Sequence, residues 1–346
     1  MRSDRIVLAQ GRRASGESLP WLVLGDRALP LRRWAHVVPL AHAASITHLV
    51  ERWPAHEEDL RSLTGSPEVA NLLRTEGFEL GALDLEAPIR PQQVFCTIGN
   101  YHGQVVQAAV DAGDGPGGAG ADRRRSDAVN ALRHRRESGR PYICLTSPHR
   151  VAGPTSALPV GDSTLDWEAE IAVVLAAGPH DIDPDQAGAF VAGYCTANDV
   201  TVRAKVTRPD LPTLGSDWVQ SKGAPGSLPL GPWFVPAWHV PDVRSLRVRL
   251  WLNDELMQDD VAADMVFTIG EQVAYLSRHT HMRAGDVICT GSPAGFGAHH
   301  GRYLRPGDLV AAEVSTLGAQ QVRCVSAARD VRGGDMTETG YASRER

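Results

Sequence analysis

The most constraining feature of this sequence is the stretch 165–175, which reads LDWEAEIAVVL. In an extended strand, successive side chains point to opposite faces, so Asp166, Glu168 and Glu170 would share one face. At a rise of roughly 3.3 Å per residue, the Cα atoms of Glu168 and Glu170 would lie about 7 Å apart. The apolar run 171–175 that follows predicts a strand that enters a hydrophobic core and carries its acidic end into a covered region.

Three carboxylates on one face of a strand repel each other unless a cation lies between them. Oxygen ligands of this kind suit Mg²⁺ and Mn²⁺, and Ca²⁺ is a further candidate. The alternative is a half-buried strand whose acidic face is simply exposed to solvent. Because the apolar run continues directly from the carboxylates, we favour a metal site.

The composition is typical of soluble globular proteins, with 42% hydrophobic and 22% charged residues in a length of 346. The net charge of −6 argues against a nucleic-acid or an anionic-membrane partner. Five scattered cysteines without a CxxC pair suggest neither a zinc site nor a disulfide framework. No long apolar segment follows Met1, so we expect no signal peptide, no membrane span and a cytoplasmic location.

The chain is expected to divide into a small N-terminal α+β domain over residues 1–90, a mostly β domain over 91–330, and a polar tail over 331–346. Pro88 and Pro91 mark the linker between the two domains. Short β-type runs, and Pro and Gly at helix ends, predict the elements of the first domain: strands 6–8, 21–24 and 27–31, and helices 41–53 and 67–76.

Two loops of the second domain follow apolar, strand-like runs. The run 94–98 leads into Gly99-Asn100-Tyr101-His102, and the run 286–290 leads into a glycine-rich segment that ends at Gly297. Site loops often follow strands in this way, and glycine-rich backbone can present N–H groups to an anionic substrate group. The segment 111–139 is either a mobile, partly helical insertion that covers a pocket or a disordered surface loop.

Several short motifs occur in the order and spacing seen in the fumarylacetoacetate hydrolase family, at 165–170, 193–203, 218–222, 230–232 and 290–297. Over about residues 92–325, the sequence therefore resembles that family. The resemblance implies an α+β, mostly β fold, in which a mixed β-roll catalytic domain of fumarylacetoacetate hydrolase type follows a small N-terminal domain. It also implies a homodimer that binds Mg²⁺ or Mn²⁺ and acts on small 2-oxo or β-diketo acids.

The resemblance also implies roles for individual residues. The implied metal ligands are Glu168, Glu170 and Asp199, which leaves Asp166 as a supporting residue. The implied catalytic lysine is Lys222, one of only two lysines in the chain, where an ammonium group would stabilise an enolate or transfer a proton. The implied substrate-binding residues are Tyr101, Arg203, Thr290 and Gly291.

One departure from the family pattern concerns the residues that activate water. Members commonly carry Asn-Tyr-x-x-His-x-x-Glu, but here Gln104 and Gln107 occupy the His and Glu positions. Glutamine can orient water but cannot take its proton at neutral pH, and general-base catalysis typically contributes about 10²–10⁴-fold. His102 is one substitute for the missing base, and the pair His134 and Glu137 in the insertion is another. A reaction that needs no activated water is the third explanation.

These observations leave three functions open. The first is a metal-dependent hydrolase that cleaves a C–C bond in a β-diketo or acylpyruvate-type acid through an enolate, which the many hydrolases in the family favour. The second is a lyase or isomerase on a 2-oxo acid (a decarboxylase, dehydratase or keto–enol tautomerase), which Gln104 and Gln107 favour. The third is a binding protein with a decayed site, against which the intact carboxylates and Lys222 argue.

Overall fold

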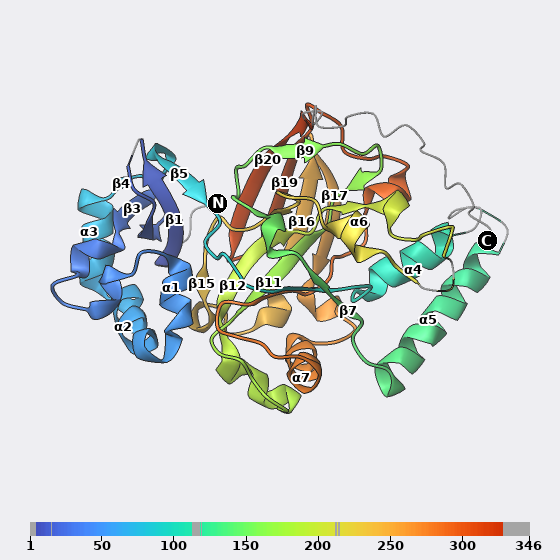
Figure 1. Cartoon of the computed structure of the whole chain (residues 1–346), viewed down its shortest axis with the longest axis horizontal. Coiled ribbons are helices and arrows are strands. Elements are labelled where there is room, and N and C mark those ends of the chain that lie inside the picture. Colours follow the sequence, from blue (N-terminus) through green and yellow to red (C-terminus); the bar gives the residue numbers. More distant parts are fainter. Residues whose placement is uncertain are drawn as a thin grey trace, which may run out of the picture.

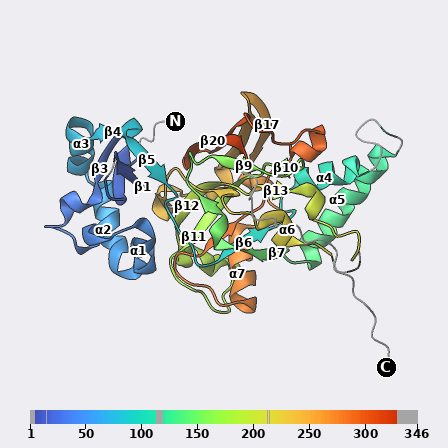
Figure 2. The same ribbon diagram turned by 45° about the horizontal axis from the view of Figure 1, so that its top comes forward.

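A computed structural model describes residues 5–327, apart from 15, 113–117, 119, 212 and 214. The N-terminal region forms a lobe beside a larger, sheet-rich body, and the helices α4 and α5 lie on the side of that body away from the lobe (Figures 1 and 2). The predicted polar tail lies outside the described residues, as does part of the predicted insertion.

The N-terminal region is a five-stranded antiparallel sheet, in the order β4-β3-β2-β1-β5, with three helices packed beside it. Its elements are β1 (Val7–Arg13), β2 (Leu19–Leu24), β3 (Arg27–Pro30), α1 (Ile46–Glu51), α2 (Trp53–Gly65), α3 (Pro67–Glu76), β4 (Phe78–Glu79) and β5 (Leu83–Glu86). The predicted helix 67–76 is confirmed, because Ser66 caps it by accepting a hydrogen bond from the backbone N–H of Val69.

The helix predicted over 41–53 is wrong in extent. The side chain of Ser45 accepts a hydrogen bond from the backbone N–H of His48, so that α1 begins at Ile46. Residues 39–42 form a separate 3-10 turn that begins with a proline. The cap therefore divides a segment that apolar periodicity alone would have joined.

The larger region is built on two β-sheets and two short ladders. The six-stranded sheet has the order β15-β12-β11-β18-β6-β7, and the five-stranded sheet has the order β17-β16-β19-β20-β9. The strands are β6 (Val94–Thr97), β7 (Ile143–Thr146), β8 (Val151–Ala152), β9 (Leu158–Val160), β10 (Leu165–Asp166), β11 (Ala169–Leu175), β12 (Val191–Asn198), β13 (Thr201–Val202), β14 (Leu228–Pro229), β15 (Val235–Pro236), β16 (Arg247–Leu252), β17 (Glu255–Val261), β18 (Val287–Cys289), β19 (Leu309–Val314) and β20 (Gly318–Ser326). This is the α+β, mostly β architecture expected from the sequence.

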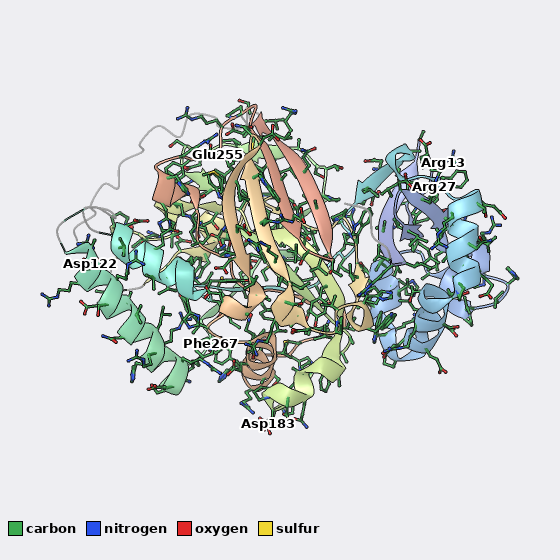
Figure 3. All side chains as sticks on the ribbon, turned by 180° about the vertical axis from the view of Figure 1, so that it is seen from behind. Arg13, Arg27, Asp122, Asp183, Glu255 and Phe267 are labelled. Atoms are coloured by element: carbon green, nitrogen blue, oxygen red, sulfur yellow. The ribbon has the colours of Figure 1, made fainter. Side chains whose placement is uncertain are left out.

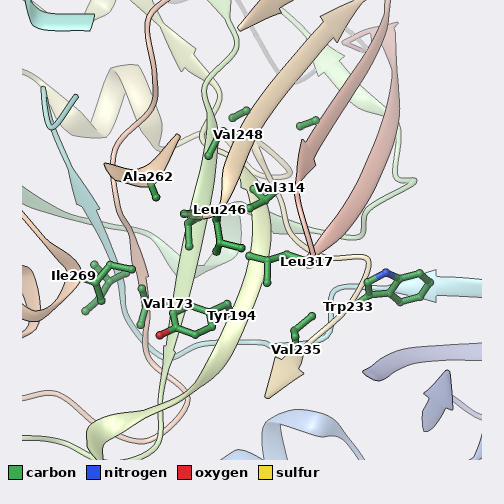
Figure 4. Close-up of a cluster of buried hydrophobic side chains, with 14 of the residues drawn as sticks. Val173, Tyr194, Trp233, Val235, Leu246, Val248, Ala262, Ile269, Val314 and Leu317 are labelled. Atoms are coloured by element: carbon green, nitrogen blue, oxygen red, sulfur yellow. The ribbon is translucent and has the colours of Figure 1, made fainter. Parts of the chain in front are cut away.

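The main core lies between the two sheets, as Figure 4 shows. Val173 of β11 and Tyr194 of β12 come from the six-stranded sheet, whereas Val248 of β16 and Val314 of β19 come from the five-stranded sheet. All four side chains are buried. Because both sheets contribute alternate residues to one apolar layer, the strands that carry the acidic residues are held rigidly from one side.

The outer face of the six-stranded sheet is covered by the N-terminal lobe. One apolar cluster continues from the lobe into residues of β11, β12 and β18. Trp53 of α2 packs edge-on against Phe234, with ring centroids 5.8 Å apart, and stacks on Trp238 at 5.7 Å. Both faces of β11 are therefore buried, which explains why all its residues are inaccessible to solvent.

The stretch 165–175 does not form the single strand that was predicted. Leu165–Asp166 pairs with β13, whereas Ala169–Leu175 pairs with β12, and residues 167–168 lie between the two strands. Side chains alternate regularly between the two faces only while a strand stays paired with the same neighbour. Because residues 165–166 and 169–175 pair with different strands, the alternation is interrupted between them. Asp166 is thereby held apart from Glu168 and Glu170.

Four helices complete the larger region: α4 (His102–Asp111), α5 (Ala121–Ser138), α6 (Trp218–Lys222) and α7 (Ile269–His279). The segment predicted as a partly helical insertion contributes α5, which packs on α4 and buries Leu132 against Val266 and Phe267 (Figure 3). Among the described residues, the helices are too short or too polar for any to cross a bilayer.

Candidate metal and active site

Three carboxylates converge where β11 begins and β12 ends. The ladder pairs Ala169 with Asn198, so the residues next to this pair, Glu168, Glu170 and Asp199, come together. The backbone N–H of Asp199 donates to the carbonyl oxygen of Glu168 at 2.8 Å, and the N–H of Glu168 donates to Oδ1 of Asn198 at 2.9 Å. One carboxylate oxygen from each residue lies within 4.8 Å of the other two, and all three residues are buried.

Two buried cations hold Asp199. Nζ of Lys222 lies 2.5 Å from Oδ2 of Asp199 and 3.3 Å from Oε2 of Glu168, and it also donates to Oγ1 of Thr201 at 2.7 Å. A guanidinium nitrogen of Arg150 lies 2.5 Å from the other oxygen of Asp199. Lys222 and Arg150 are both buried, so these charge-assisted contacts are poorly screened by water.

Arg203 joins Asp166 to the carboxylate group. Its Nε donates to Oδ2 of Asp166 at 2.8 Å, and its Nη1 lies 2.8 Å from Oε1 of Glu168. Asp166 also accepts backbone hydrogen bonds from Gly297 and Ala298 at 2.7 and 3.0 Å. Asp166 therefore fixes the position of Arg203 and of the end of the glycine-rich loop at Gly297. This agrees with the supporting role that the resemblance suggested for Asp166.

Glu170 differs from its neighbours because, among the described residues, no cationic side chain pairs with it. Its Oε2 accepts a hydrogen bond from the backbone N–H of Gly291 at 2.8 Å. Burial and the neighbouring carboxylates of Asp199 and Glu168 raise the pKa of Glu170 well above its usual range. For Glu168, burial also acts upward, but Lys222 and Arg203 more than offset it and lower the pKa. Glu170 is therefore the carboxylate of the three whose charged form the protein compensates least.

A divalent cation fits this group of residues. Four buried carboxylates, including that of Asp166, face three cations, Lys222, Arg150 and Arg203. Hard oxygen ligands are those that Mg²⁺ and Mn²⁺ prefer. An ion among the three convergent carboxylates would compensate the charge of Glu170 that the protein leaves uncompensated.

We expect Mn²⁺ to bind more tightly as the pH rises from 5 to 7. Burial raises the pKa of Asp199 to about 6, although Arg150 and Lys222 act in the opposite direction, and burial also raises the pKa of Glu170 well above its usual range. Both carboxylates must lose their protons before they bind an ion, so the dissociation constant should fall by about tenfold per pH unit for each proton released. Titration calorimetry at pH 5, 6 and 7 would measure this, and a constant affinity would contradict it.

The metal-free protein should show the opposite pH dependence in its stability. Because the folded pKa of Asp199 lies above its ordinary value of 3.8, the folded state binds more protons than the unfolded state between these two values. The contribution of this group to the free energy of unfolding is therefore greatest below about pH 4 and is lost as the pH rises through 6.

Tyr101, Thr290 and Gly291 lie beside the carboxylates. The hydroxyl of Tyr101 is buried without a hydrogen-bond partner, whereas the hydroxyl of Thr290 donates to the backbone oxygen of Ile171 at 3.0 Å. Gly291 has a φ of +95°, and an added Cβ would lie 2.8 Å from Cβ of Asn100. Only glycine therefore allows the backbone N–H at this position to approach Glu170.

The residues that could activate or orient water differ in their exposure to solvent and in their contacts. Gln104 is buried, and Oε1 of Gln107 accepts a hydrogen bond from the backbone N–H of Gly295 at 2.9 Å. Nδ1 of His102 lies 2.7 Å from the backbone oxygen of Asp264, and the side chain is 43% exposed. His134 and Glu137 are exposed on α5. The catalytic roles of His102 and Gln104 stay predictions.

Sequence reasoning missed Arg150, which is completely buried and contacts Asp199 directly. Its Nε donates to Oγ of Ser227 at 3.0 Å, and a terminal nitrogen donates to the backbone oxygen of Val200 at 3.1 Å. The residue lies in a short helical turn, Pro148–Arg150, far from the other motifs in the sequence. One arginine among many carries no local signal of burial, so only the tertiary contacts reveal it.

A buried group of convergent carboxylates, set at the ends of paired strands in a double-sheet body, is a set of oxygen ligands that could hold a divalent metal ion. The chain belongs to the fumarylacetoacetate hydrolase family, because the model for the fumarylacetoacetate (FAA) hydrolase C-terminal region matches residues 93–325. This match confirms the resemblance seen in the sequence. Members of the family are enzymes, and they include both hydrolases and isomerases.

The individual proteins that the chain resembles have modest sequence identity to it. A protein of Burkholderia multivorans named "Putative hydrolase" is 36% identical over 185 residues, which is 52% of this chain and 63% of that protein. The chain thus matches about three fifths of the length of this curated relative. A probable 2-hydroxyhepta-2,4-diene-1,7-dioate isomerase from Mycobacterium abscessus, whose structure is known, is 27% identical to this chain. The match has a TM-score of 0.64 and covers 93% of this chain and 99% of that one.

A third comparison supports the fold alone. Maleylpyruvate hydrolase from Sphingobium sp. SYK-6, whose structure contains manganese(II) and pyruvate, is 20% identical to this chain. Its TM-score is 0.66, and the match covers 93% of this chain and all of that one. The α+β, mostly β fold expected from the resemblance is therefore confirmed along nearly the whole length.

Proposed function

We propose that this protein is a divalent-metal-dependent hydrolase that cleaves a C–C bond in a β-diketo or acylpyruvate-type acid. The observation that carries the proposal is the buried convergence of Glu168, Glu170 and Asp199 with Lys222 between two of them. A bound Mg²⁺ or Mn²⁺, held by the three carboxylates, would polarise the oxo group of the substrate and stabilise negative charge that develops beside it.

The protein's own groups around the carboxylates suit an anionic substrate. Within the part of the chain that the structure describes, one terminal nitrogen of Arg203 and the hydroxyl of Tyr101 are buried and have no hydrogen-bond partner. Buried polar atoms are normally paired, so these two donors are suited to the carboxylate and oxo oxygens of an acid. The ammonium group of Lys222, whose pKa is raised above its ordinary value by Asp199 and Glu168 despite burial, stays protonated and stabilises adjacent negative charge.

A lyase or isomerase that acts on a 2-oxo acid is the second candidate. Gln104 and Gln107 replace the usual His and Glu, and Gln107 is engaged by the backbone of Gly295. The isomerase of Mycobacterium abscessus, at 27% identity, belongs to the same fold. A decarboxylase, dehydratase or tautomerase would use the same carboxylates and Lys222 without attack by water.

Isotope tracing separates the candidates. A panel of acylpyruvates and β-diketo acids is incubated with the Mn²⁺-loaded protein in H₂¹⁸O, and products are analysed by mass spectrometry. We expect cleavage with one ¹⁸O atom in the carboxylate of the acyl fragment. Deuterium exchange at C3 of the substrate without cleavage would instead establish an isomerase, loss of CO₂ would establish a decarboxylase, and neither outcome with any acid would favour a binding protein.

The partner of the protein is, in this proposal, a small oxo-acid substrate, with no nucleic-acid or membrane partner. The homodimer that the family resemblance implies, and a cytoplasmic location, are also proposals. The edge strand β7 exposes Leu145, the residue before the strand is the exposed Tyr142, and the neighbouring helix α6 exposes Val219. Light scattering of the purified protein would show twice the chain mass if the homodimer forms.

A further inference from the structure

Two side chains that sequence reasoning did not connect meet beside the glycine-rich loop. Asp111 is the last residue of α4, and His299 lies in the short helical turn Gly297–His300. Oδ2 of Asp111 lies 2.6 Å from Nδ1 of His299. The side chain of His299 is only 8% exposed and that of Asp111 is 19% exposed, so the pair is shielded from solvent.

Among the described residues, the second ring nitrogen of His299, Nε2, is buried and has no hydrogen-bond partner. Oδ2 of Asp111 lies 2.6 Å from Nδ1 of His299, although the two atoms are not aligned as a regular hydrogen bond. A carboxylate beside Nδ1 favours the tautomer with the proton on that nitrogen, which leaves the lone pair of Nε2 available. A buried nitrogen without a partner is costly in a folded protein, so its presence suggests a ligand or reacting group at this position.

Burial favours a neutral ring for His299. Burial lowers the pKa of His299, Asp111 opposes this effect, and Arg203 adds to it. Asp166, on β10, is the other charged group that faces the ring, and it acts in the same direction as Asp111. A neutral imidazole can accept a proton at pH 7, whereas the amides of Gln104 and Gln107 cannot.

The position of His299 links it to the carboxylate centre. Its ring stacks on Phe296 with centroids 5.5 Å apart, and the guanidinium of Arg203 lies 4.2 Å from the centroid of the same Phe296 ring. Arg203 in turn contacts Glu168. The backbone N–H of Ala298, directly before His299, is fixed by Asp166. The imidazole of His299 and the guanidinium of Arg203 are thus connected through the ring of Phe296, which both of them contact.

We propose that His299, oriented by Asp111, is the general base of this site and replaces the His–Glu pair that the sequence lacks. The inference rests on the proposed function, and it goes further by naming the atom that takes the proton. His299 would be the catalytic residue and Asp111 a positioning residue. By contrast, the side chain of His102 is 43% exposed, and its Nδ1 lies 2.7 Å from the backbone oxygen of Asp264 and 3.8 Å from the carboxylate of the same residue.

In hydrolysis of an acylpyruvate, Nε2 of His299 takes one proton from water while the water oxygen bonds to the distal carbonyl carbon. The bond between that carbon and the methylene carbon then breaks, and its electron pair stays on the methylene carbon. The proton on Nε2 passes to this carbon to give a 2-oxo acid. The acyl fragment leaves as a carboxylic acid, which ionises in solvent.

The test compares His299→Gln, Asp111→Asn and, as a matched control, His300→Gln, which changes the exposed neighbour on the same turn. With Mn²⁺ present, we expect kcat of His299→Gln to fall by about 10²–10⁴-fold, with KM and Mn²⁺ affinity within threefold of wild type. At Mn²⁺ concentrations that saturate the carboxylates at every pH, the acidic limb of the kcat profile should disappear in His299→Gln. The His300→Gln variant should match wild type in every measurement.

Asp111→Asn should leave the protein folded and lower kcat less than His299→Gln does. In ¹⁵N NMR spectra of labelled protein, the ring nitrogens of His299 should show a proton on Nδ1 in wild type and a mixture of tautomers in Asp111→Asn. A purely structural contact would not produce this change. An unchanged tautomer, or a kcat of His299→Gln within threefold of wild type, would overturn the proposal.

Solvent exchange separates this inference from the proposed function. If no acylpyruvate is cleaved, but wild type exchanges C3 deuterium of a 2-oxo acid and His299→Gln does not, the base assignment stands and the hydrolase assignment falls. If cleavage occurs and is insensitive to His299→Gln, the hydrolase assignment stands and the base assignment falls. If wild type shows neither cleavage nor exchange, both are overturned. Equal losses of kcat and Mn²⁺ affinity in His299→Gln would mean that the pair only supports the fold.

Discussion

Replacing Glu170 by glutamine should weaken Mn²⁺ binding by at least about 100-fold and, at the same time, stabilise the metal-free protein. The substitution removes one of three convergent carboxylates and keeps its size. It also removes a buried group whose charged form has no cationic partner among the described residues, so the free energy of unfolding should rise by about 1–3 kcal/mol near neutral pH. Calorimetric titration with Mn²⁺ and chemical denaturation in EDTA would measure the two effects.

The opposite signs of these effects are the decisive part of the prediction. A residue that only supports the fold would lower both quantities, whereas a residue that binds an ion at the cost of stability lowers one and raises the other. Glu313→Gln is a suitable control, because Glu313 is buried but pairs with Arg249 at 2.8 Å on the five-stranded sheet. The control should leave Mn²⁺ affinity unchanged. Unaltered affinity in Glu170→Gln would remove it from the metal ligands.

Replacing Lys222 by methionine should destabilise the metal-free protein by about 3–5 kcal/mol, because it leaves two buried carboxylates without their shared cation. Nζ of Lys222 contacts the carboxylates of both Asp199 and Glu168. Because this position is buried, a water molecule could not take the place of the ammonium group without a large cost in free energy. We also expect kcat to fall by about 10²–10⁴-fold, since the ammonium group would no longer stabilise charge on the substrate.

Mn²⁺ affinity should move in the other direction in Lys222→Met. Removing a positive charge beside Glu168 and Asp199 increases the attraction of the carboxylates for a divalent ion. The control is Lys205→Met, at the only other lysine of the sequence. The side chain of Lys205 is 45% exposed, and its Nζ lies 3.2 Å from Oδ2 of Asp162. An exposed pair of this kind contributes about 0–1 kcal/mol, so the control should behave as wild type. If both variants lose stability equally, the central position assigned to Lys222 is wrong.

The buried Arg150 suggests why the centre tolerates so many carboxylates. With Lys222, it holds both oxygens of Asp199, so that Asp199 has a fixed orientation before any ion arrives. Glu168 is likewise fixed by Arg203 and by a 2.8 Å hydrogen bond from the hydroxyl of Thr201. Such preorganisation lowers the conformational cost of binding, and it leaves Glu170 as the carboxylate with the least compensation.

Much of the centre could be predicted from short stretches of sequence. The acidic alternation before an apolar run placed Glu168 and Glu170 together, and the order of motifs added Asp199, Lys222 and Arg203. The structure brings Glu168, Asp199, Lys222 and Arg203 into one hydrogen-bonded group, and a carboxylate oxygen of Glu170 lies within 4.8 Å of those of Glu168 and Asp199. The proximity of Glu168 and Glu170 could be predicted because it depends on neighbours in the chain. Asp199, Lys222 and Arg203 came from the resemblance to the family, and the catalytic and metal-binding roles of all five stay predictions.

The tertiary structure alone decided the remaining features. The break at residues 167–168 arises because β10 and β11 pair with different strands, and Arg150 reaches Asp199 from a distant turn. Asp111 and His299 meet only because α4 packs against the end of the glycine-rich loop. Contacts between residues far apart in the sequence depend on sheet pairing and on the packing of helices, and no period of the sequence encodes them. The sequence by itself thus determined that Glu168 and Glu170 lie close together, and the fold decided which cations hold the carboxylates and which carboxylate lies beside His299.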